Sequence, residues 1–462
     1  MFEIDMKKPC RIHFIGIGGI SMSALAQVLA DAGFQVSGSD RQESDMTRLL
    51  VSKGITVLYG HRRSNITKDL DVMVYTSAIH PDNPEYQEAV ELNIPILTRA
   101  QLLGQMMKNY PTSIAVSGTH GKTSTTSMIS EILLQAQTDP TLLVGGILSS
   151  IGGNLRIGHS DYMVTEACEY TNSFLSFFPT VGLILNVEED HLDFFKDLDD
   201  IRHSFREFAA LLPEHGCLII NYDIPNLEYI TSACKGRVIT YTNRIGETGA
   251  DYYPTAISYN HMAHGTFTLM GPDGTLQEYS LQVPGAHNIS NAIAAIALAD
   301  HLEIDATTTG QALHGFTGTD RRFQYKGTLG GITIVDDYAH HPTEIRAALT
   351  AARNISHKRL WCVFQSHTYT RTRAFLEEFA EALSLADVVV LPDIYAAREV
   401  NETGISSDHL RQALERRGTE AYYFPTFDEV ENFLLENCTT GDLLITMGAG
   451  DVVKIGESLL GI

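Results

Sequence analysis

The sequence contains few cysteines, and their positions exclude the common thiol-based sites. The six cysteines in its 462 residues are Cys10, Cys168, Cys217, Cys234, Cys362 and Cys438. No two of them form a C-x-x-C pair, and none falls at a Cys/His spacing typical of a metal centre. Unpaired thiols scattered through a long chain favour a reducing compartment over a disulfide-stabilised secreted protein.

Long apolar runs are also missing from the sequence. None reaches the roughly 18 residues that a membrane-spanning helix needs. The N-terminal segment MFEIDMKKPCRIHFIG lacks an apolar stretch followed by a signal-peptidase site. We therefore expect a soluble, cytoplasmic protein.

Positive charge is scarce. The chain has 33 Lys and Arg against 56 Asp and Glu, which gives a formal net charge of −23 at pH 7. So acidic a surface repels nucleic acids and anionic membranes, which excludes both as the main partner. A highly charged substrate would then need a local pocket lined by basic groups or backbone amides.

What the sequence does contain is a repeated alternation of apolar strands and amphipathic helices. This alternation predicts α/β architecture with mostly parallel sheets. The length predicts about three domains, and we expect boundaries near residues 108 and 319. The resulting segments are 1–108, 109–318 and 319–462. Each begins with a strand that runs into a glycine-rich or polar turn.

The strongest motif is the loop from Gly118 to Thr123, GTHGKT, between a predicted strand and a predicted helix. A phosphate is bound by backbone N–H groups at a helix N-terminus, by a loop that wraps it and by a cation. The two glycines permit the wrapping, Lys122 supplies the cation, and the Thr123 hydroxyl suits Mg²⁺. The motif predicts binding of a nucleoside triphosphate. The alternative is a glycine-rich turn with a solvated lysine.

Glu166 and His191 each follow a predicted strand, at the edge where open α/β sheets place their ligands. A carboxylate together with Thr123 suits Mg²⁺, which prefers oxygen ligands, whereas an imidazole is less typical. The alternative for His191 is an ordinary histidine with no ligand.

Two further polar clusters favour the same nucleotide site. Asn288 and Asn291 share one face of the first turn of a predicted helix, although asparagine there often only caps the helix. Arg321 and Arg322 follow a polar turn from which a cation reaches a phosphate across a cleft, and the alternative is a solvated pair.

Two polar runs follow strands in the C-terminal segment. The run DDYAHHP spans residues 336–342, and HTYTRTR spans residues 367–373. The first is typical of a site, although Pro342 and Glu344 also suit the start of a helix. The arginines of the second suit a substrate carboxylate, because a guanidinium binds carboxylates with two parallel hydrogen bonds.

The N-terminal turn GIGGIS, residues 16–21, is similar to a dinucleotide-binding fingerprint, with Asp40 where a ribose-binding acid would lie. Taken alone, the turn indicates an NAD-dependent oxidoreductase. Ser21 replaces the third glycine, however, and the segment is short. The same geometry suits any diphosphate, including that of a UDP-sugar.

Seven segments, in this order, resemble the Mur ligase family: HFIGIGGISMSALA, SGTHGKTSTTS, TEACE, NVEEDHLD, PGAHNISNA, TGTDRRF and VDDYAHHPTEI. The resemblance covers essentially the whole chain. It implies a Rossmann-like N-terminal domain for a UDP-sugar and a P-loop ATPase-like central domain with a mixed sheet. The C-terminal domain would be Rossmann-like and would bind ATP and an amino acid.

The resemblance also implies roles for individual residues. The UDP-sugar would be bound by Gly16, Gly18, Gly19, Ser21, Ser39, Asp40, Thr76, Ser77 and Ala78. ATP would be bound by Gly118, Thr119, His120, Gly121, Lys122, Thr123, Ser124, Asn288, Asn291, Arg322 and Asp337. Mg²⁺, or Mn²⁺ in its place, would be held by Thr123, Glu166 and His191. Catalysis would rest on Lys122, Glu166, His191, Arg322 and Asp337. The amino acid would be bound by His340, His341 and Arg371.

Within the family, the segment GIGGISMS favours the member that joins L-alanine to UDP-N-acetylmuramate in peptidoglycan precursor synthesis. A murein-peptide recycling ligase is the alternative. Cys168, Glu169 and Tyr170 replace the acidic segment usual after the metal-site glutamate, which leaves open which oxygens approach a second metal ion. The stretch between Lys196 and Lys235 contains no lysine. The carbamylated lysine that bridges metals in some relatives is therefore not expected.

Overall fold

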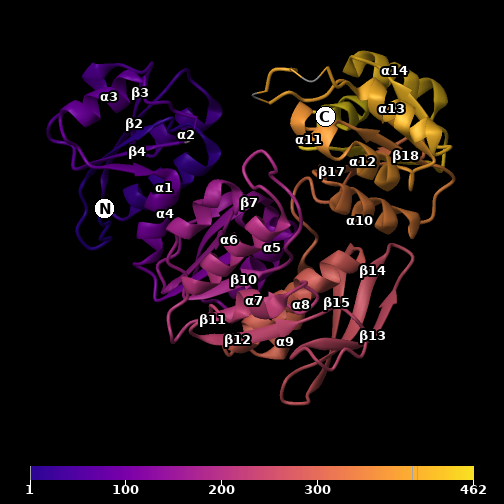
Figure 1. Ribbon diagram of the computed structural model, residues 1–462, viewed down its shortest axis with the longest axis horizontal. Coiled ribbons are helices and arrows are strands. Elements are labelled where there is room, and N and C mark those ends of the chain that lie inside the picture. Colours follow the sequence, from indigo (N-terminus) through magenta and orange to yellow (C-terminus); the bar gives the residue numbers. More distant parts are fainter. Residues whose placement is uncertain (1, 77, 398, 403) are drawn as a thin grey trace.

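In the computed structural model of the protein, residues 2–76, 78–397, 399–402 and 404–462 are described. They form three α/β units in chain order (Figure 1). The N-terminal and C-terminal units lie on either side of the central one. This arrangement confirms the predicted fold class of three α/β domains. No helix among the described residues has the length and apolar character that crossing a membrane requires.

The N-terminal unit is a parallel sheet of order β3-β2-β1-β4-β5. Its strands are β1 (Arg11–Ile15), β2 (Gln35–Asp40), β3 (Thr56–Tyr59), β4 (Val72–Tyr75) and β5 (Ile96–Thr98). Its helices are α1 (Ile20–Asp31), α2 (Asp45–Ser52), α3 (Pro84–Glu91) and α4 (Arg99–Met107), with a 3₁₀ turn η1 (Arg63–Asn65). The parallel order puts the carboxyl ends of the strands, and the turn before α1, at one edge.

The central unit contains a seven-stranded sheet of order β12-β11-β10-β6-β9-β7-β8, in which only the β7–β8 pair is antiparallel. Its strands are β6 (Thr112–Ser117), β7 (Thr141–Leu148), β8 (Gly153–Arg156), β9 (Tyr162–Glu166), β10 (Val181–Ile184), β11 (Cys217–Asn221) and β12 (Arg237–Tyr241). Its helices are α5 (Lys122–Gln135), α6 (Leu198–Ala210), α7 (Leu227–Thr231), α8 (Ala286–His301) and α9 (Ala306–Gly315), with 3₁₀ segments η2 (Ser149–Ile151) and η3 (Tyr170–Ser176). Strands β6 and β10 are almost wholly buried, because helices cover both faces of the sheet.

A second, antiparallel sheet of order β13-β14-β15 belongs to the same unit. It consists of β13 (Tyr253–Tyr259), β14 (His264–Met270) and β15 (Leu276–Pro284), and it lies at the outer end of the unit (Figure 1). Phe267 of β14 and Leu281 of β15 pack with Ile293 of α8 in a common core. Strand β15 ends at Pro284 and α8 begins at Ala286, so the packing of this sheet against α8 also fixes the position of the N-terminus of α8.

The C-terminal unit is a six-stranded sheet of order β16-β17-β21-β18-β19-β20, parallel except for β16. Its strands are β16 (Gln324–Leu329), β17 (Ile332–Asp337), β18 (Leu360–Phe364), β19 (Val388–Leu391), β20 (Glu420–Tyr423) and β21 (Leu443–Met447). Its helices are α10 (Pro342–Arg353), α11 (Tyr369–Ala374), α12 (Leu376–Leu383), α13 (Ser407–Arg416), α14 (Phe427–Asn437) and α15 (Val453–Leu460). The expected boundaries near 108 and 319 fall between α4 and β6 and between α9 and β16.

Candidate active site between the central and C-terminal units

The loop from Gly118 to Thr123 joins β6 to α5, as the motif predicts. Gly121 forms the N-cap of α5 with φ +84°, a left-handed conformation that favours glycine. Asn186, which follows β10, holds the loop through both backbone polar groups of His120. Its Oδ1 accepts from the His120 amide at 2.7 Å, and its Nδ2 donates to the His120 carbonyl at 3.0 Å. The loop is thus fixed in shape, with the N-terminus of α5 directed into the site.

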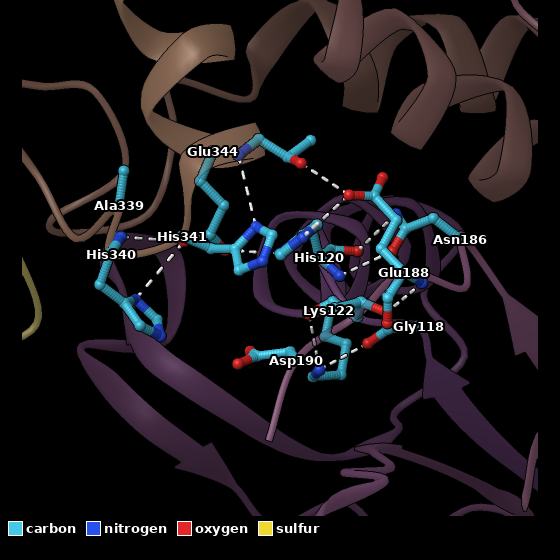
Figure 2. A network of polar contacts seen from close by, with 12 residues as sticks. Gly118, His120, Lys122, Asn186, Glu188, Asp190, Ala339, His340, His341 and Glu344 are labelled. Atoms are coloured by element: carbon cyan, nitrogen blue, oxygen red, sulfur yellow. Dashed lines mark hydrogen bonds and ion pairs between the residues drawn. The ribbon is translucent and has the colours of Figure 1, made fainter. Parts of the chain in front are cut away.

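Lys122 is buried beneath this loop rather than solvated. Its Nζ donates to the Gly118 carbonyl (Figure 2) and to the Thr119 carbonyl. It also lies 3.0 Å from Oε2 of Glu169. Burial lowers the pKa of Lys122, but the negative charge of Glu169 outweighs that effect and raises the pKa above its usual value. Lys122 therefore carries a fixed positive charge at the end of the loop.

Glu169 is the carboxylate that sequence reasoning did not assign. Besides contacting Lys122, its Oε1 lies 3.8 Å from Nε2 of His191. The predicted ligand Glu166 accepts from the Gly145 amide at 2.6 Å, and its charge also acts on Lys122. The only sequence signal for this second carboxylate was that Cys168, Glu169 and Tyr170 replace the acidic segment usual in the family.

His191 lies on the far side of Glu169. Its backbone adopts φ +54°, and its ring stacks on Tyr170 with centroids 4.5 Å apart. Burial lowers the pKa of this imidazole, which keeps it neutral and able to bind a metal ion. Carboxylates, an imidazole and a hydroxyl are the types of ligand that could hold Mg²⁺ or Mn²⁺ here. Among the described residues, however, the one group of three or more His, Cys, Asp or Glu whose ligand atoms all lie within 4.8 Å of one another is His120, Glu188 and His341.

The predicted nucleotide residues converge on a cavity of about 290 Å³ between the central and C-terminal units. Seven of them line it: His120, Gly121, Ser124, Asn288, Asn291, Arg322 and Asp337. Gly285, not an asparagine, is the N-cap of α8, so the capping interpretation of the two asparagines is wrong. They instead bond to each other at 3.3 Å, and Oδ1 of Asn291 lies where a Cβ on Gly121 would fall.

The two arginines after α9 have different positions. Arg322 lies 3.4 Å from the Thr123 hydroxyl and lines the cavity. Arg321 instead pairs with Asp336 at 3.1 Å and donates to the Gly448 carbonyl. Asp337 accepts from the Phe323 and Ala339 amides, and its burial raises its pKa to about 7 against the opposing charge of Arg322.

A second cavity, of about 550 Å³, is lined by Tyr170, Asp190, His191, His367 and Arg371 among others. Arg371 donates to Oδ1 of Asp190 at 2.9 Å. The ring of His367, the first residue of the polar run 367–373, lies 6.0 Å from the ring of His340. Burial lowers the pKa of each of these histidines to about 4, so both are neutral at pH 7.

His341 is engaged between the units instead of facing the second cavity. Its Nε2 donates to the Glu189 carbonyl at 2.9 Å, and its Nδ1 accepts from the Thr343 amide as the N-cap of α10. Its ligand atom lies within 4.8 Å of those of His120 and Glu188, which are further potential metal ligands. The hydrogen bonds already formed give His341 a structural role in joining the units.

The C-terminal unit contacts the segment after β10 at several points. Thr343 donates to Oε2 of Glu188 at 2.6 Å, next to the His341 and Arg371 contacts already described. His120 in the phosphate loop also hydrogen-bonds Oε1 of Glu344 at 3.2 Å (Figure 2). The phosphate loop is therefore tied directly to α10, so that movement of the C-terminal unit is coupled to the loop.

The N-terminal turn lies at the carboxyl edge of its own sheet. Asp40 accepts from the Gly18 amide at 2.8 Å, and Gly16 adopts φ +79°. Ser39 is buried and donates to Glu85 at 2.6 Å, away from the turn. The remaining predicted residues of this group are Gly19 and Ser21, at the start of α1, and Thr76 and Ala78, which follow β4. Ser77 lies outside the described residues.

Family models match three consecutive parts of the chain. The Mur ligase family catalytic domain matches residues 11–111, the Mur ligase middle domain residues 116–299, and the glutamate ligase domain of Mur ligases residues 321–450. A UDP-N-acetylmuramate–L-alanine ligase of Agathobacter rectalis is 59% identical over 460 residues, which cover 100% of both chains. The protein of that name from Lachnospira eligens is 53% identical over 460 residues, again covering 100% of both.

Solved structures give the same result. The UDP-N-acetylmuramate–alanine ligase of Thermotoga maritima superimposes with a TM-score of 0.80 at 29% identity, covering 98% of each chain. A murein peptide ligase of Psychrobacter arcticus superimposes with a TM-score of 0.69 at 24% identity, also covering 98% of each. The second likeness concerns the fold alone.

Proposed function

The chain belongs to the Mur ligase family, and we propose that it joins L-alanine to the lactyl carboxylate of UDP-N-acetylmuramate at the expense of ATP. The 59% identity to the UDP-N-acetylmuramate–L-alanine ligase of Agathobacter rectalis, over the full length of both chains, carries the proposal. The reaction belongs to peptidoglycan precursor synthesis, and we place it in the cytoplasm, where ATP is available.

The first step in this proposal is acyl activation. An oxygen of the lactyl carboxylate attacks the γ-phosphorus of ATP, the bond to the bridging oxygen breaks, and ADP leaves with that electron pair. Such a transfer needs mainly positioning and neutralisation of charge. The buried ammonium of Lys122 and the guanidinium of Arg322 supply positive charge around the phosphate loop.

In the second step, the uncharged amine of alanine attacks the carbonyl carbon of the acyl phosphate. The resulting tetrahedral intermediate expels inorganic phosphate and leaves an amide. Arg371, in the second cavity, would bind the carboxylate of alanine with two parallel hydrogen bonds. The segment after β10 lines both cavities, through Glu188 in the first and Asp190 in the second, which supports a position of the amine close to the phosphate loop.

Thr123, Glu166, Glu169 and His191 are the groups that would hold Mg²⁺. When bound, the ion would supply further neutralisation of the phosphate oxygens. Glu169 has a second task, because it holds Lys122 in place through their ion pair. The contacts of His120, Thr343, His341 and Arg371 between the units would keep water from the acyl phosphate, which otherwise hydrolyses.

The decisive experiment mixes the protein with ATP, Mg²⁺, UDP-N-acetylmuramate and a panel of amino acids, and measures phosphate release. We expect release that requires both the sugar nucleotide and L-alanine. Release that requires a muropeptide in place of alanine would assign the chain to murein-peptide recycling. A change in nicotinamide absorbance would revive the oxidoreductase interpretation of the N-terminal turn.

A further inference from the structure

Arg99 is a half-buried cation that has no acidic partner. It is the first residue of α4, directly after β5, and its NH1 donates to the Ser21 hydroxyl at 3.1 Å. Among the residues that the structure describes, no carboxylate forms an ion pair with it. Arg11, Arg48 and Arg63 of the same unit each pair with one or two acidic side chains. In the described part of the chain, Arg41 and Arg62 likewise form no ion pair, but both are exposed to water, whereas Arg99 is half-buried.

The missing partner is unexpected in so acidic a chain, which has 56 acidic and 33 basic residues. Burial lowers the pKa of Arg99, which means that its environment disfavours the charge. A cation partly removed from water is unfavourable unless an anion compensates it. Since the described part of the chain offers none, a bound anion would compensate the charge.

Arg99 also has a fixed position between two units. Helix α4 packs against η3 of the central unit so closely that a Cβ on Gly104 would overlap the Ser176 carbonyl. At the other end of α4, Lys108 lies over the Phe178 ring, 4.2 Å from its centroid. These contacts fix helix α4, and with it the backbone of Arg99, at the joint between the two units. The guanidinium itself is oriented by its hydrogen bond to Ser21.

The surroundings of Arg99 indicate which anion it binds. On one side lies Ser21 in the first turn of α1, whose N-terminus follows the glycine turn. The charge of Arg99 also acts on Cys168. Cys168 directly precedes Glu169, which forms the ion pair with Lys122. A helix N-terminus with a guanidinium beside it is a strong site for a phosphate group.

We infer that Arg99 binds the diphosphate of the sugar nucleotide, together with the N-terminus of α1. This inference rests on the proposed function and adds a residue to it that no sequence motif indicated. The planar guanidinium forms two parallel hydrogen bonds with phosphate oxygens, and α1 contributes backbone N–H groups. Arg99 then fixes the sugar nucleotide at the joint, so that its acid end extends toward Lys122.

The test measures the affinity of the full-length protein for UDP, uridine and ATP by calorimetry. In Arg99→Ala we expect the dissociation constant for UDP to rise by about tenfold or more, because charged hydrogen bonds to phosphate are lost. Affinity for uridine and ATP stays unchanged, which also shows that the variant is folded. Arg99→Lys keeps the charge but loses the planar guanidinium, so we expect its dissociation constant for UDP to lie between those of the wild type and Arg99→Ala.

Arg11→Ala is the matched control, since Arg11 lies at the opposite end of β1 and pairs with Asp69. It leaves UDP affinity unchanged. The inference would be overturned if Arg99→Ala left the affinity for UDP unchanged. This holds even if the variant bound UDP-N-acetylmuramate more weakly than the wild type. Failure of the wild-type protein to ligate alanine, with UDP binding still dependent on Arg99, would instead count against the proposed function alone.

Discussion

The ammonium of Lys122 lies 3.0 Å from the carboxylate of Glu169, and beneath the phosphate loop the Glu169 side chain is buried and that of Lys122 is mostly buried. The pair joins two motifs that are 47 residues apart in the sequence. A charge held in this way needs little rearrangement when phosphate arrives, because the protein has already oriented it. The pair therefore provides the first tests of the proposed mechanism.

Replacing Lys122 by alanine should lower kcat by at least ~10²-fold, by analogy with removal of one donor to a transition state. Phosphate release under saturating substrates measures the effect. Lys326→Ala is a suitable control, because Lys326 is also mostly buried and paired with a glutamate, Glu457, but lies outside the site. Near-normal turnover of Lys122→Ala would refute its assigned role.

Glu169→Gln should also lower kcat by about 10²-fold, since it removes the partner of Lys122 and a carboxylate of the metal-binding set. Because the two residues act together, the double variant Lys122→Ala/Glu169→Gln should lose far less than the product of the single losses. Multiplicative effects would show that the two side chains act independently. Glu166→Gln, measured over a range of Mg²⁺ concentrations, compares the two glutamates as metal ligands.

The loop, the fold class and the seven named residues that line one cavity could be found from the sequence, because each depends on a local pattern. Glycines and Lys122 between a strand and a helix define the loop within a few residues, and Asn288 and Asn291 share a helical turn. The contact between His120 and Glu344 could not be predicted, because 224 residues separate them and only the docking of two units brings them together. Arg99 was missed for a similar reason, since its isolation from acidic groups is visible only in three dimensions.

The His120 contact should make docking of the C-terminal unit depend on pH. Burial lowers the pKa of His120, but its contacts with Glu188 and Glu344 outweigh that effect and raise the pKa from 6.5 to about 9, despite the neighbouring His341. Protonated His120 therefore contributes stability that is complete below pH 6.5 and is lost as the pH rises through 9, and the part due to Glu344 of α10 favours the docked state. We expect a loss on the order of 1 to 3 kcal/mol.

Hydrogen exchange of the α10 amides from pH 6 to pH 10, corrected for the intrinsic rate, measures this loss. His120→Gln should show the weaker protection at all pH values, with the alkaline step removed. Glu344→Gln provides a second check, because it removes one of the two carboxylates that raise the pKa. An alkaline step that persists in both variants would assign the titration to another group.

Asp190 should control the affinity for alanine through Arg371. The two side chains are buried and bonded at 2.9 Å, and the charge of Arg371 holds the pKa of Asp190 far below its usual range despite burial. Asp190→Asn weakens the orientation of the guanidinium, so the KM for alanine should rise about tenfold or more. The KM for ATP should stay unchanged. Asp199→Asn is the control, because it removes an exposed carboxylate that pairs with Arg202 outside the second cavity. An unaltered KM for alanine in Asp190→Asn would separate Asp190 from amino-acid binding.

Gly104 tests whether the N-terminal and central units are as closely packed as the position of Arg99 requires. A methyl group at Gly104 would overlap the backbone carbonyl of Ser176, which cannot move aside as a flexible side chain would. Gly104→Ala should therefore lower the free energy of unfolding by about 1–3 kcal/mol, in spite of the better helix propensity of alanine. Gly315→Ala is the matched control, because Gly315 ends α9 with no neighbour in the way of a Cβ, and it should be neutral or slightly stabilising. If chemical denaturation found both variants equally stable, α4 and η3 would not be in contact as described, and Arg99 would lose its fixed position at the joint.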